Sequence, residues 1–191
     1  MKQIYQDLWT LAKPYYQKGQ EMDLAHIEWM LNVAEDIIKN ENLAESIFLP
    51  LIILHDLGYS QIPDDNPFQL DLRKAHLEKG AKLAGKLLKK INYPEAKIKI
   101  ITNYIAIHDN WAFGEHELFI NDRILGVFSD LDFVWMASEQ GFLALRKILN
   151  KSTPEMISYL KTNEKLTNRP FSSVATKELF ESLLQNRARE Y

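Results

Sequence analysis

The stretch "LIILHDLGYSQ", Leu51 to Gln61, begins as an apolar run and ends in an adjacent histidine and aspartate. Such a run normally faces a protein core, where an unpaired imidazole or carboxylate would cost several kcal/mol of desolvation. His55 and Asp56 must therefore be paired, bound to a metal or exposed. The sequence from Asn42 to Gly58 is apolar almost throughout, which predicts a central buried helix that Gly58 terminates.

The rest of the chain also has a helical pattern. Apolar residues recur every three to four positions, and 7 glycines and 7 prolines are few for a chain that must make many hairpins. We therefore predict an all-α, multi-helix bundle. Further helices are expected at 3–18, 23–41, 72–91, 95–108 and 118–138, with weaker helical segments around 142–150, 154–161 and 176–185. Loops are expected at 59–71 and 109–117.

Composition limits the classes of function. With 191 residues and 46% hydrophobic content, the chain is expected to form one domain over 1–191. A formal charge of -3 gives no support for binding to nucleic acid or to an anionic membrane. The absence of cysteine excludes disulfides and thiolate metal sites and is consistent with a reducing cytoplasm. No segment approaches the ~18 apolar residues of a membrane span.

Four of the five histidines fall on predicted helices, at or beside apolar faces. One such histidine would be interpreted as a core residue, but four together favour a site. Imidazole nitrogens and carboxylate oxygens without sulfur are the donor set of Mn, Fe, Co, Mg or Zn. The four histidines are His26, His55, His76 and His108.

These residues resemble a known signature. His26, the doublet in "LHDLG" and a later aspartate in "VFSDLDF" resemble the H…HD…D pattern of the HD-domain superfamily of metal-dependent phosphohydrolases. The resemblance covers about 23–136 and leaves 137–191 as a C-terminal helical extension. It implies a metal site between the central helices, with His55 and Asp56 as principal ligands.

Two further matches refine the resemblance. "HLEKGA", which begins at His76, resembles the H-x-x-x-G-A pattern of HD proteins, and "YIAIH" ends in a histidine, His108, at a similar place. In members that bind two metals, histidines at these two places hold the second ion. The resemblance therefore implies two ions, with Asp56 bridging them.

More than one residue could match the last aspartate of the signature. "SDLDFV" contains Asp130 and Asp132, of which we prefer Asp130 as the ligand because it follows a small residue. Asp122 in "NDRIL" also fits, but it lies only 14 positions after His108 (122 minus 108). A solvated turn at the start of a helix is the alternative interpretation of Asp122.

The resemblance implies hydrolysis of a phosphate ester by a metal-activated water, with a nucleotide or small phosphate ester as substrate and Asp56 in the catalytic centre. Lys79, beside His76, is a candidate contact for the substrate phosphate, whereas its basic neighbours are expected on a solvated helix face. Two alternatives stay open: a di-iron oxygenase that cleaves a small organic substrate with dioxygen, and a non-catalytic metal-binding regulatory module. The sequence leaves the substrate and the oligomeric state undetermined.

Overall fold

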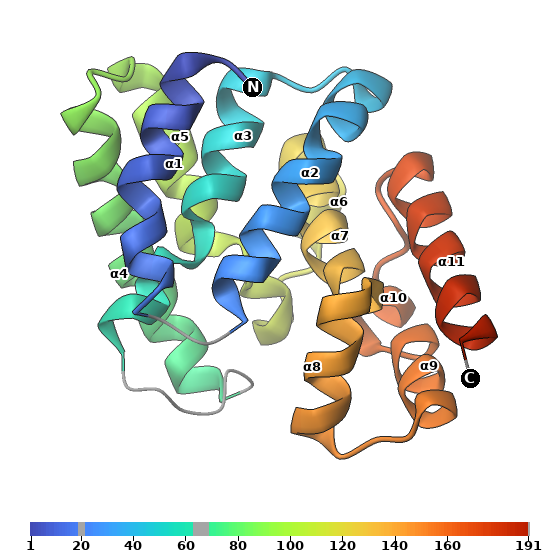
Figure 1. The fold of residues 1–191 in the computed structure, drawn as a ribbon. Coiled ribbons are helices and arrows are strands. Elements are labelled where there is room, and N and C mark those ends of the chain that lie inside the picture. The colour runs from blue at the N-terminus through green and yellow to red at the C-terminus, as the bar shows by residue number, and fades with distance from the viewer. Residues whose placement is uncertain (19–21, 63–68, 191) are drawn as a thin grey trace.

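The computed structural model describes residues 1–18, 22–62 and 69–190, and all regular structure in these ranges is helical (Figure 1). This confirms the predicted all-α, multi-helix fold. None of the helices in these ranges is both long and apolar enough to cross a membrane. The helices are α1 (Gln3–Tyr16), α2 (Asp23–Glu41), α3 (Glu45–Leu54), η1 (His55–Gln61), α4 (Leu70–Lys90), α5 (Glu95–Ile107), η2 (Asn110–Phe113), α6 (Glu117–Asn121), α7 (Arg123–Val134), η3 (Trp135–Ala137), α8 (Glu139–Leu149), α9 (Thr153–Lys161), α10 (Glu164–Asn168) and α11 (Val174–Arg189).

Helix α3 is the central element of the N-terminal part. It contacts α1, α2, α5 and α7, and every residue from Ile47 to Leu54 is buried. Because a helix that is apolar on all sides avoids water only when other helices surround it, these neighbours cover it on every face. The end of α3 is held by α1, since the Tyr16 hydroxyl donates to the Ile53 carbonyl over 2.8 Å.

The residues after α3 form a 3-10 helix, η1, where a loop was expected from residue 59. Gly58 does not terminate the α-helix, which ends at Leu54, but allows η1 to approach α4 closely. A Cβ atom on Gly58 would lie 2.0 Å from the carbonyl oxygen of His76. The tight contact fixes the His55–Asp56 doublet against α4. Pro63 and Pro67, on which the predicted loop rested, lie outside the described residues.

The single helix expected at 118–138 is divided into α6 and α7. The break lies at Asp122, whose backbone is extended and whose carboxylate accepts a hydrogen bond from the Leu125 amide at 3.0 Å. The same side chain accepts from the Tyr104 hydroxyl at 2.7 Å. Asp122 is therefore a helix N-cap rather than a residue of a solvated turn.

The C-terminal helices form a second apolar cluster beside the first. In Figure 1, α2 lies between the N-terminal helices α1 and α3 and the C-terminal helices α8, α9 and α11. Residues of α7, α8, α9 and α11 share this cluster, with Phe133, Phe142 and Phe180 among its buried members. Helix α7 thus belongs to both parts, which brings the C-terminal third of the chain next to the histidines.

Candidate metal centre

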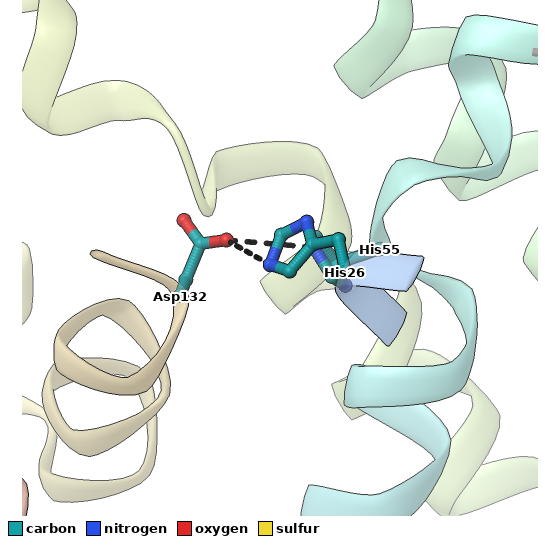
Figure 2. Close-up of side chains that lie close together, drawn as sticks. All are labelled: His26, His55 and Asp132. Carbon is teal, nitrogen blue, oxygen red and sulfur yellow. Dashed lines mark ion pairs between the residues drawn. The ribbon is translucent and has the colours of Figure 1, made fainter. Parts of the chain in front are cut away.

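His26, His55 and Asp132 come from three helices and converge on one point. His26 lies in the first turns of α2, His55 follows α3, and Asp132 lies near the end of α7. Figure 2 shows the Asp132 carboxylate directed at both imidazoles, with Oδ1 3.2 Å from Nε2 of His26 and 3.6 Å from Nε2 of His55. Their ligand atoms lie within 4.8 Å of one another, close enough to share a metal ion.

Asp56 faces two pairs of histidines with its two carboxylate oxygens. Oδ2 lies 3.6 Å from Nδ1 of His26 and 3.1 Å from Nε2 of His55. Oδ1 lies 3.4 Å from Nε2 of His108 and 3.6 Å from Nε2 of His76. A carboxylate placed in this way is suited to bridge two ions.

The second pair of histidines is accompanied by Asp109. The Nε2 atoms of His76 and His108 lie 3.3 Å apart, and Oδ2 of Asp109 lies 3.9 Å from Nε2 of His76. Asp109 is held by an ion pair with Arg73 at 3.1 Å and by the indole N–H of Trp111, also at 3.1 Å. Asp109 was not predicted from the sequence as a site residue, although His108 and Asp109 repeat the His-Asp doublet of residues 55 and 56.

Backbone contacts orient two of the imidazole rings. Nδ1 of His55 lies 3.0 Å from the Ile52 carbonyl and Nδ1 of His108 lies 2.8 Å from the Ile105 carbonyl, so each Nδ1–H donates to the backbone. This assignment leaves the lone pair on Nε2, directed into the centre. The buried Nε2 atoms of His26 and His55 have no partner of good hydrogen-bond geometry. A divalent cation would satisfy these atoms, so the donor set fits a metal.

Burial and charge determine the protonation of the centre. Burial would raise the pKa of Asp56, but the imidazoles of His55, His108 and His26 beside its carboxylate hold this pKa well below its usual range. The pKa of Asp132 is likewise well below its usual range, because the imidazoles of His26 and His55 beside its carboxylate outweigh its burial. Burial and the nearby His108 lower the pKa of His76 to about 4. Two ionised carboxylates and the neutral imidazole of His76 are forms that bind metal, whereas Asp56 and Asp132 raise the pKa values of His26 and His55 despite burial, so a metal ion would displace protons from these two rings.

The structure brings five of the six predicted ligands together, but Asp130 is not among them. Positions 130 and 132 point about 200° apart on a helix, so only one of them can face the histidines. Asp132 does so, whereas the Asp130 carboxylate accepts hydrogen bonds from Arg169 at 2.7 Å and from the Ser172 amide at 2.6 Å. The geometry therefore replaces Asp130 with Asp132 in the candidate ligand set.

Lys79 also lies elsewhere than the sequence analysis expected. Its ammonium donates to the Gln61 carbonyl over 2.7 Å, and the side chain is not part of the cavity wall beside the histidines. The cations that line this cavity are Arg73 and Lys165. Arg73 was expected on a solvated helix face, and Lys165 lies in the segment for which the sequence suggested no role.

A cavity of about 150 Å³ adjoins the candidate metal centre. His26, Asp56, His108, Asp109 and Asp132 form its polar side. The aromatic residues that line the cavity, here called the aromatic wall, include Tyr159 of the C-terminal third. The aromatic lining residues are Tyr59, Trp111, Phe133, Trp135 and Tyr159.

Lys165 is the buried cation of this cavity. Its side chain is 1% exposed, and its ammonium donates to the Ser129 carbonyl. Nζ lies 5.0 Å from the centre of the Trp111 ring and 5.3 Å from that of Phe133. Burial lowers the pKa of Lys165 to about 8. The side chain nevertheless carries its charge at neutral pH.

Comparison of the chain with family models, with curated proteins and with solved structures gives no match. Function is therefore inferred from the residues of the site and from their geometry.

Proposed function

We propose that this protein is an HD-type metal-dependent phosphohydrolase that hydrolyses a phosphate ester at a centre of two divalent ions. The single observation that carries the proposal is the position of Asp56, whose two oxygens face two separate pairs of histidines at 3.1–3.6 Å. Burial of a single carboxylate does not require four imidazoles around it. A carboxylate that bridges two ions is expected to have such neighbours, because each ion needs further ligands.

The ligand atoms divide into two groups. His26, His55 and Asp132 would hold one ion together with Oδ2 of Asp56. Oδ1 of Asp56 would join a second group at the other ion, which consists of His76, His108 and Asp109. The neighbouring imidazoles hold the pKa values of Asp56 and Asp132 low, so both carboxylates are ionised, as metal ligands must be.

Divalent ions held there would act as Lewis acids toward a phosphoryl oxygen and make hydroxide available near neutral pH. The side chains around the centre would bind the substrate. Arg73 and Lys165 add positive charge beside the centre, where it offsets the charge of a phosphate group. The aromatic wall makes part of the cavity apolar, which strengthens these electrostatic interactions. No protein nucleophile is required.

The experiment is a screen of phosphate release by the purified protein loaded with Mn²⁺, Co²⁺ or Mg²⁺, with wild type compared to Asp56→Ala. We expect release from at least one phosphate ester, and loss of both activity and bound metal in Asp56→Ala. Asp36→Ala is the matched control, because Asp36 is exposed on α2. Full activity in Asp56→Ala would contradict the proposal.

The same preparation distinguishes the oxygenase alternative. Protein purified without oxygen is assayed for iron and for oxygen consumption with organic substrates. A di-iron protein that consumes oxygen and releases no phosphate would replace the hydrolase proposal. A protein that binds metal but catalyses neither reaction would support the regulatory alternative.

A further inference from the structure

The C-terminal third of the chain contributes a buried cation, Lys165, to the cavity. Lys165 lies in the short helix α10, yet its side chain is 1% exposed and reaches the wall of the cavity. A buried ammonium is costly unless an anion or several acceptors surround it.

The local partners of Lys165 do not include a counter-charge. Among the residues that the structure describes, its ammonium has one hydrogen-bond acceptor, the Ser129 carbonyl, and forms no ion pair. The three nearby carboxylates that influence its pKa most are engaged by other groups. Asp130 pairs with Arg169, Asp132 with the imidazole of His26, and Asp109 with Arg73.

The surroundings of Lys165 indicate where an anion would bind. Its ammonium lies 5.0 Å from the centre of the Trp111 ring, and the Arg73 guanidinium lies 5.1 Å from the same ring. Both cations therefore adjoin one indole, beside Asp109 and His108 of the candidate metal centre. An anionic group beside Lys165 in this part of the cavity would lie close to the candidate metal ligands, with the charge of Arg73 on the same indole.

The volume of the cavity limits the size of the organic part of the substrate. A volume of about 150 Å³ is near that of an engineered cavity that binds benzene and is well below the range usual for sites of larger ligands. A small organic group would fill this volume against Phe133, Trp135 and Tyr159, whereas the base and ribose of a nucleotide would extend beyond it.

We propose that Lys165 binds the phosphoryl group of a small phosphate monoester, whose organic part is about the size of one six-membered ring and contacts the aromatic wall. This inference rests on the proposed function for the hydrolysis itself, but the binding of the anion by Lys165 does not depend on turnover.

The test compares the binding of inorganic phosphate to wild type, Lys165→Met and Lys161→Met by calorimetry, with metal-free and with Mn²⁺-loaded protein. Methionine keeps the unbranched shape of the side chain, and Lys161 is an exposed lysine of α9 that serves as the control. We expect binding to weaken about tenfold or more in Lys165→Met, because a hydrogen bond to a charged group is lost. Lys161→Met should bind as wild type does. If Lys165→Met does not fold, Lys165→Gln is used in its place.

A second measurement compares phosphate release from phenyl phosphate with release from nucleoside monophosphates. The inference expects release from the small ester and little from the nucleotides. Unchanged phosphate binding in Lys165→Met, or a preference for nucleotides, would overturn it while leaving the hydrolase proposal intact. Weaker phosphate binding in Lys165→Met, together with no hydrolysis of any ester, would refute the hydrolase proposal and keep Lys165 as the anion-binding residue.

Discussion

The buried pair of Asp130 and Arg169 provides a test of whether Asp130 is structural, as its contacts indicate, or a metal ligand. Both side chains are 1% exposed, and their oxygen and nitrogen atoms lie 2.7 Å apart. Asp130→Asn preserves the shape of the side chain and an acceptor for the Ser172 amide, but it leaves the Arg169 guanidinium buried without a counter-charge. Loss of one partner of a buried pair costs about 3–5 kcal/mol. For a chain of this length, that corresponds to a fall in Tm of roughly 6–20 °C.

The pair itself is expected to add little net stability. Burial raises the pKa of Asp130 even though Arg169 lies beside it, so desolvation offsets most of the attraction. The double variant Asp130→Asn/Arg169→Met, which has neither charge, should therefore recover most of the loss. The assay is chemical and thermal unfolding followed by circular dichroism, with a chelator present so that bound metal does not contribute. An Asp130→Asn protein that is as stable as wild type but no longer binds metal would refute the reasoning.

Three further predictions concern the centre and its supports. Asp132→Asn should lose bound metal by elemental analysis while Asp130→Asn retains it, because only Asp132 faces His26 and His55; equal metal contents would contradict this. Gly58→Ala should reduce the free energy of unfolding by about 1–3 kcal/mol, because the Cβ atom of the alanine would lie 2.0 Å from the His76 carbonyl oxygen. In the control variant Gly85→Ala, the Cβ atom meets only Thr102 at 3.5 Å, so this change should be neutral or stabilising. For metal-free protein, the free energy of unfolding of wild type relative to that of Lys165→Met should rise by about 2 kcal/mol or more between pH 8 and pH 10. Burial lowers the pKa of Lys165 to about 8, so the folded state releases this proton at a lower pH than the unfolded state does. A difference independent of pH would show that this lysine titrates normally.

The histidines could be placed from the sequence because each one follows a local pattern. His26, His55, His76 and His108 lie on or at the end of helices whose apolar faces identify the core, and helices of a compact bundle direct such residues inward. The choice between Asp130 and Asp132 could not be made in this way. Nearly all of α7 is buried, so its apolar pattern does not distinguish the face toward the histidines from the face toward Arg169.

The residues that complete the cavity depend on tertiary structure. Lys165 follows His26 by 139 positions (165 minus 26) and lies in a helix of five residues, too short to show a period. Only the packing of the C-terminal helices against α7 brings it to the site. Asp109, unlike Lys165, could have been identified from the sequence, because it forms a His-Asp doublet with His108.

The most direct test of the central claim is a calorimetric titration with Mn²⁺ of wild type and of the double variant His76→Ala/His108→Ala. The distances from Asp56 to the four histidines predict two ions per chain in wild type and one in the variant, whose His26, His55 and Asp132 remain in place. One ion per chain in both proteins, bound with the same affinity, would contradict the two-ion centre.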